Sequence, residues 1–206
     1  MFARLVMVSC ILGSALALAA GAAAAQDGAP VRVRGQVAGV DGRTLTVQAR
    51  DGATERVELA ADATILGVVP AELHAIVPGT FVGTAAVPQP DGRFTALEVV
   101  VFPETMRGAG EGRYAWDLTP ESTMTNATVH AAEAEANGRV LTLRYPEGET
   151  TVVVPEDAPV VGLEPGDASL LRPGSHVFVP AAARGPDGTL SAKAIAVGKD
   201  GLVPPM

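Results

Sequence analysis

Apolar and polar residues alternate along much of the chain, and this period of two predicts β-strands rather than helices. The alternation begins at Val31, resumes after Asp41-Gly42 and resumes again after Asp51-Gly52. Asp-Gly is a strong signal for a two-residue hairpin turn, because glycine accepts the positive φ that such turns need. The sequence therefore predicts a meander of three strands that ends near residue 60.

The rest of this half predicts a short helical segment and two further strands. Pro70 would begin one or two helical turns over residues 70–76, because proline suits the first position of a helix. Strands are expected over residues 81–87 and 94–102, separated by the turn Pro90-Asp91-Gly92. Three strands, a helical crossing and two strands are the element order of a five-stranded OB-type barrel.

The pattern then repeats. Residues 41–47 (DGRTLTV) return as residues 137–143 (NGRVLTL), 96 positions later. Other turn signals recur at the same spacing, including Pro186-Asp187-Gly188. We therefore expect an all-β protein with two tandem OB-like barrels that arose by internal duplication, in residues 26–102 and 123–198. The alternative is a single sandwich assembled from both halves. An irregular tail is expected over residues 199–206.

Residues 1–25 have the features of a cleaved export signal. Arg4 precedes an apolar run over residues 5–20, and small residues lead up to Ala25, so Gln26 would begin the mature chain. A retained N-terminal anchor is the alternative interpretation. Lipidation of Cys10 is a further alternative, although few apolar residues precede it. Cleavage would remove this cysteine, the only one in the chain, and would leave no disulfide or thiol chemistry.

Composition narrows the possible partners. Cleavage would leave 181 of the 206 residues, with all 23 acidic and 14 of the 15 basic residues, and hence a formal charge of −9. This charge argues against nucleic acid and anionic lipid as partners. Beyond the export signal no run is long enough to span a membrane, so no membrane insertion of the mature chain is expected. Only 8 residues are aromatic, so the core should consist mainly of valine, leucine and alanine.

An irregular loop over residues 103–122 separates the halves and is the best candidate for a binding site. Long loops concentrate binding roles, and tryptophan beside arginine is common at contacts. The competing interpretation is that its aromatic residues only pin the loop to a barrel. The candidate ligand- or partner-binding residues are Arg107, Glu111, Arg113, Tyr114, Trp116 and Asp117.

No catalytic, metal-binding or cofactor-binding motif is evident. His74, His130 and His176 lie far apart in the sequence, and none has a second histidine at metal-ligand spacing. No serine lies in a Gly-x-Ser-x-Gly elbow. The glycines of residues 108–112 have no Lys-Ser/Thr after them, so they do not resemble a phosphate loop beyond their glycine content. We therefore predict no catalytic residue, metal ligand or cofactor.

The unit V-x-G-x-V-x-x-V-D-G-R-T-L-T-V of residues 33–47 resembles a small β-repeat domain of unknown function found in secreted bacterial proteins. The segment from Arg107 to Val129 is similar to exported proteobacterial members with two such repeats. The resemblance implies OB-like repeats and residence in the periplasm, with no established activity. Some similar sequences are labelled metal-transporter permease, but this chain lacks the membrane spans a permease needs.

These observations favour a non-catalytic periplasmic binding or scaffolding module, whose partner would be an unknown periplasmic protein or small ligand. An accessory metal-binding protein for envelope metal uptake is the alternative, based on the histidines and the acidic charge. A hydrolytic enzyme with an unrecognised site is a weaker one.

Overall fold

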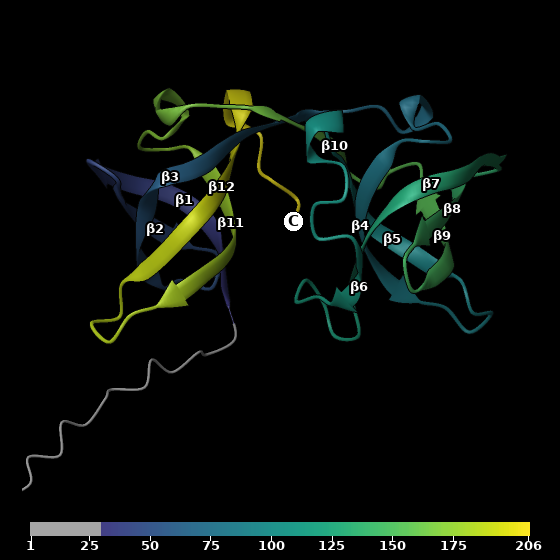
Figure 1. Cartoon of the computed structure of the whole chain (residues 1–206), viewed down its shortest axis with the longest axis horizontal. Coiled ribbons are helices and arrows are strands. Elements are labelled where there is room, and N and C mark those ends of the chain that lie inside the picture. The colour runs from purple at the N-terminus through teal and green to yellow at the C-terminus, as the bar shows by residue number, and fades with distance from the viewer. Residues whose placement is uncertain (1–29) are drawn as a thin grey trace, which may run out of the picture.

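The computed structural model describes residues 30–206, so the predicted export signal over residues 1–25 and its cleavage at Gln26 lie outside the described residues. The described chain is all-β, as predicted, and its strands gather in two lobes (Figure 1). The strands are β1 (Val31–Asp41), β2 (Thr44–Ala49), β3 (Thr54–Pro70), β4 (Phe81–Pro88), β5 (Phe94–Val101), β6 (Gly112–Ala115), β7 (Thr123–Glu135), β8 (Gly138–Tyr145), β9 (Gly148–Pro155), β10 (Val160–Pro165), β11 (His176–Arg184) and β12 (Leu190–Gly198).

The first lobe is a closed five-stranded barrel. The meander of β1, β2 and β3 forms as the alternation predicted. β3 then pairs with β12 in parallel, β12 pairs with β11, and β11 returns to β1, so the ring closes. This barrel therefore combines residues 31–70 with residues 176–198.

The second lobe contains the remaining long strands, which also pair in a closed circuit. β4 pairs with β5 and with β7, and β8 joins β7 to β9. A short parallel pairing of β9 with β5 completes the circuit. Residues 81–101 thus combine with residues 123–155.

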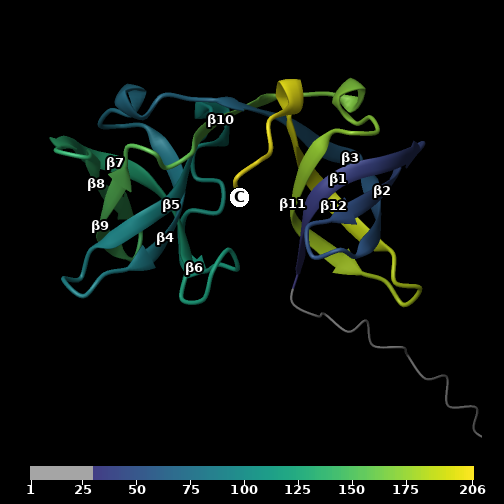
Figure 2. The same cartoon turned by 180° about the vertical axis from the view of Figure 1, so that it is seen from behind.

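The structure does not show the expected tandem arrangement, with one barrel in residues 26–102 and another in 123–198. Neither half closes on itself, because each circuit takes strands from both halves (Figure 2). β10 pairs with the end of β3 and with β5, and so connects the two lobes. Strand pairing therefore joins the two lobes in one continuous sheet.

The predicted helical crossings are not present as helices. β3 continues through Pro70, and only a single 3-10 turn, η1 (Leu73–Ala75), follows it. A second 3-10 turn, η3 (Ala168–Leu170), precedes β11. Pro70, with which the helix would have begun, instead ends β3 and pairs with Val161 of β10. Sheet hydrogen bonds therefore replace helical ones at this point.

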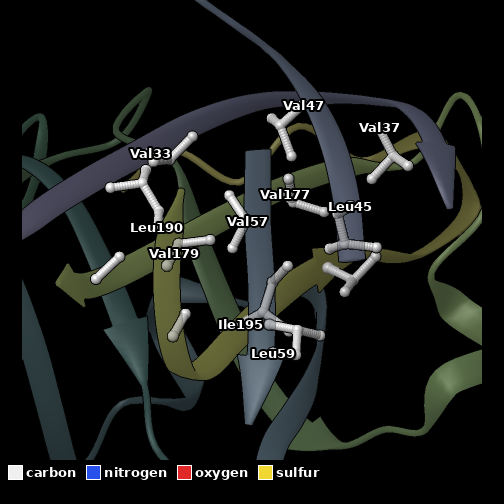
Figure 3. Packing of buried hydrophobic residues seen from close by; sticks show 13 residues of the cluster. Val33, Val37, Leu45, Val47, Val57, Leu59, Val177, Val179, Leu190 and Ile195 are labelled. Atoms are coloured by element: carbon white, nitrogen blue, oxygen red, sulfur yellow. The ribbon is translucent and has the colours of Figure 1, made fainter. Parts of the chain in front are cut away.

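Each lobe has its own apolar core, and a third cluster lies between them. In the first lobe, inward residues at alternate positions, such as Leu45 and Val47 of β2, are fully buried (Figure 3). The second lobe is filled equivalently, with Leu141 and Leu143 of β8 fully buried. The third cluster consists of Val68, Val100, Val161, Phe178, Ala196 and Met206, with partly buried Leu66, Phe102, Trp116, Leu163 and Leu202 packed against it.

Candidate functional site

The loop that links β5 to β7 is more ordered than the sequence suggested. It contains a 3-10 turn, η2 (Glu104–Met106), and the short strand β6, which pairs with β7. This pairing holds the aromatic part of the loop beside the first half of β7, on the side opposite to β4. The loop therefore lies on the side of the second lobe that faces the first lobe (Figure 1).

Trp116 is the centre of a contact between the lobes. Its ring packs edge-on against Phe178 of β11, with 6.1 Å between the ring centroids. Tyr114 lies 6.0 Å from the same ring, and its hydroxyl accepts a hydrogen bond from the Asn126 side-chain amide at 3.3 Å. The guanidinium of Arg32 stacks over Trp116 at 4.0 Å. Residues of both lobes thus meet on one tryptophan.

Asp117 adds a polar link at the same place. Its carboxylate accepts two hydrogen bonds from Arg34 of β1, at 2.6 and 3.2 Å, and lies 3.7 Å from Arg32. Burial alone would raise the pKa of Asp117, but the Arg34 hydrogen bond and the charges of both arginines lower it below its ordinary value. Asp117 therefore stays ionised and ties the loop to the first lobe.

The other three predicted residues lie elsewhere. Arg107 binds Glu104 and donates to the Gly79 carbonyl at 2.8 Å, which fastens the start of the loop to the second lobe. Arg113 stacks over Phe94 at 3.8 Å. Glu111 is exposed and lines a separate surface hollow with His130. The structure thus brings Tyr114, Trp116 and Asp117 together and separates Arg107, Glu111 and Arg113 from them.

A cavity of about 300 Å³ lies beside Trp116, and we call it the interlobe cavity. The first lobe, the second lobe and the β5–β7 loop all contribute to its walls, which are mainly apolar. The lining residues are Leu66, Gly83, Val100, Phe102, Met106, Ala109, Gly110, Tyr114, Trp116, Met124, Asn126, Leu163, Phe178, Pro180, Ala194, Ile195, Ala196 and Met206.

The last residues of the chain, expected to form an irregular tail, are not free. After the 3-10 turn η4 (Lys199–Gly201), the chain runs into the space between the lobes (Figures 1 and 2). Arg50 donates to the Pro204 carbonyl at 2.6 Å, and Arg34 Nε donates to Met206 O at 2.6 Å. The Met206 side chain is only 5 % exposed and forms part of the cavity wall.

Glu98 of β5 is the one buried acid in the described chain. It is 0 % exposed, and neither carboxylate oxygen has a hydrogen-bond partner among residues 30–206. It lies two positions from Val100 on its strand, and therefore on the face that is turned toward the first lobe. Burial raises the pKa of Glu98 to about 8, and the charges of Arg34 and Arg50 oppose this rise.

Sequence reasoning found the aromatic part of the site and missed most of its partners. Arg32 and Arg34 occupy the polar positions of the alternating pattern that begins at Val31, and nothing local distinguishes them from other exposed arginines. Glu98 did carry a signal, because it is a single charge within the otherwise apolar strand of residues 94–102. Met206 also stood at the end of an apolar run over residues 202–206.

Residues 30–206 contain no group of three or more histidine, cysteine or acidic side chains placed to hold a metal ion. His74 lies 3.8 Å from Glu72 on the surface, between Leu73 and Ile76 that pack in the second lobe, whereas His176 begins β11 of the first lobe. Residues 30–206 also contain no helix that is long and apolar enough to cross a membrane.

Comparisons with protein-family models, with curated proteins and with solved structures gave no match for this chain.

Proposed function

We propose that this protein is a non-catalytic binding module whose binding site is the interlobe cavity. The observation that carries the proposal is the cavity itself, about 300 Å³ in volume and walled by apolar side chains from both lobes. Apolar concave sites with few polar groups are typical of ligand-binding sites. The pattern of residues 1–25 further supports a periplasmic location for this binding role.

The size and lining of the cavity set the class of ligand. A dry apolar cavity of about 150 Å³ takes one benzene molecule, so this cavity has room for about two groups of that size. Charged ligands would lose their hydration against Phe102, Met124 and Leu163, and no side chain in the cavity lining carries a charge to compensate them. We therefore expect an uncharged, largely apolar ligand group.

Two polar side chains at the wall could orient such a ligand. Asn126 is 7 % exposed, and its Oδ1 has no hydrogen-bond partner among residues 30–206. The indole Nε1 of Trp116 also lacks one within the described chain. Buried polar atoms without partners are uncommon, and they concentrate at functional sites. Both residues line the cavity, which supports a binding role for it over a purely structural one.

Titration with the uncharged probe N-phenyl-1-naphthylamine tests this proposal. Trp116 is the only tryptophan of the chain, so quenching of its emission together with enhanced probe emission reports binding next to it. Ala194→Phe places a ring in the cavity and should weaken probe binding by about tenfold or more, the equivalent of about 1.4 kcal/mol.

Ala183→Phe is the matched control, because Ala183 is exposed on β11 of the same lobe. This variant should bind the probe as the unsubstituted protein does. Equal affinity of all three proteins would show that the probe binds elsewhere, and no binding by any of them would refute the proposal.

A further inference from the structure

Residues 202–206 lie between the lobes in the manner of a bound peptide. Met206 places its side chain at the wall of the interlobe cavity, and Leu202 packs against the same apolar cluster. Pro204 is buried as well. The segment thus contributes several apolar side chains to an interface that two other parts of the chain build.

The contacts of this segment resemble recognition of a separate peptide more than continuation of the fold. Within the described chain, no backbone–backbone hydrogen bond joins residues 203–206 to a neighbour. Two arginine side chains hold the backbone instead, Arg50 at the Pro204 carbonyl and Arg34 at Met206 O. Both contacts are made to main-chain oxygens, those of Pro204 and Met206, so another peptide of similar shape could make them equally well.

A sharp turn at η4 holds the segment in place. Asp200 has φ of 51° and Gly201 has φ of 81°, so two successive left-handed residues reverse the chain. The reversal brings the Leu202 carbonyl so close to Gly198 that a Cβ at this position would lie 1.7 Å from the carbonyl oxygen. Glycine is therefore required at position 198 for residues 202–206 to dock.

The internal segment fills the site only in part. The volume of about 300 Å³ remains beside the Met206 side chain with the segment in place. A peptide that carried a large apolar side chain beyond the position of Met206 would bury it in this volume. Burial of such a side chain removes apolar surface from water, which would favour that peptide over the internal one.

We propose that residues 202–206 are an internal occupant of a peptide-binding site, and that a partner protein displaces them with an extended, uncharged, proline-containing segment. The proposal rests on the proposed function and names the class of partner. Arg34 and Arg50 would hold carbonyls of the incoming backbone, and the cavity would take its apolar side chain. Proline suits such a segment because it favours an extended backbone and lacks an N–H group that would need a partner.

The attached segment must be displaced before a peptide can bind. A tethered ligand has an effective concentration in the millimolar range, so a peptide that only equals it competes poorly with the intact chain. Gly198→Ala removes this competition, because its Cβ excludes the Leu202 carbonyl while the φ of −65° at position 198 suits alanine. Gly39→Ala is the matched control, since a Cβ there meets no atom within 4 Å.

The test measures the fluorescence anisotropy of a labelled peptide with the sequence of residues 201–206, titrated with the full chain. Gly198→Ala should bind at least about tenfold more tightly than the unsubstituted protein and Gly39→Ala. Adding Arg50→Met to Gly198→Ala should weaken binding by about tenfold, the equivalent of one charge-assisted hydrogen bond. A second peptide that carries a phenylalanine after the final methionine should bind more tightly than the first, because its ring would enter the remaining volume.

Met206→Asp is a second way to release the segment, because it places a charge at the apolar wall, and it serves if Gly198→Ala does not fold. Absence of peptide binding by a folded, released variant that still binds N-phenyl-1-naphthylamine would overturn this inference and leave the proposed function intact. Absence of probe binding by the unsubstituted protein and by the variants would instead refute the proposed function itself.

Discussion

Replacement of Glu98 by glutamine tests the electrostatics of the interface between the lobes. Glu98 is 0 % exposed, and burial raises its pKa from an ordinary value of 4.5 to about 8, despite the nearby charges of Arg34 and Arg50. Between these two pH values the folded protein binds a proton that the unfolded chain has released. Stability due to this group is therefore fully present below about pH 4.5 and is lost as the pH rises toward 8.

The size of the effect follows from the displacement of the pKa. In the window between the two pKa values, each pH unit lowers the free energy of unfolding by up to about 1.4 kcal/mol. A folded-state pKa near 8 predicts a loss of about 3 kcal/mol between about pH 5 and pH 7.5. Glutamine has nearly the same shape and does not titrate, so Glu98→Gln should remove this pH dependence.

The assay is urea unfolding of the unsubstituted protein and of Glu98→Gln at about pH 5 and about pH 7.5. The free energy of unfolding of Glu98→Gln minus that of the unsubstituted protein should rise by about 3 kcal/mol between these pH values. Glu58→Gln is the control for the substitution itself, because Glu58 is exposed on β3 of the same chain. A constant difference for Glu98→Gln would refute the assignment of a raised pKa to this side chain.

Three further predictions follow from the core, the interlobe contacts and the strand exchange. Leu141→Ala should lower the free energy of unfolding by about 2–5 kcal/mol, because the side chain is fully buried, and a loss below about 1 kcal/mol in urea unfolding would contradict the packing of the second lobe. Arg34→Met should cost about 1–2 kcal/mol through its bonds to Asp117 and Met206, whereas Arg144→Met, which breaks only the exposed pair with Glu149, should cost less than about 1 kcal/mol by thermal unfolding. Proteolytic nicking near Glu121 should leave the two fragments associated in native size-exclusion chromatography, since each circuit of strands needs both, and their separation without denaturant would rule out the exchanged pairing.

The turns and strands were predictable from local sequence because their causes are local. Gly42 and Gly52 have φ of 59° and 90°, which explains why glycine marks both hairpins of the meander. Asp41 itself ends β1 and pairs with Thr44, so the two turn residues of the first hairpin are Gly42 and Arg43 rather than Asp41 and Gly42. The inward positions of β2 and β8 also followed from alternation, since successive side chains of a strand point to opposite faces.

The candidate site was predictable only where a residue was unusual in its own stretch. Trp116 and Tyr114 drew attention as rare aromatics within an irregular loop, and both line the interlobe cavity. Arg32 and Arg34 looked like their solvated neighbours, because a guanidinium gives no local sign that a tryptophan or a carboxylate will approach it from residues 114–117. Met206 became part of the site only through the chain reversal at η4.

The sequence by itself determined the all-β class, the order and faces of most strands and the turns between them, because hydrophobic period and glycine conformation act over a few residues. Only the tertiary structure decided which strands share a ring. β12 shows the same alternation of inward and outward residues whether it closes a barrel with the strands of its own half or with β3, so the pattern cannot decide between the two. The extended run of β3 through Pro70, paired with β10, carries the chain from the first lobe to the second and so directs β4 and β5 away from the strands that precede them. The interlobe cavity, its arginines and the docked residues 202–206 all result from that exchange of strands.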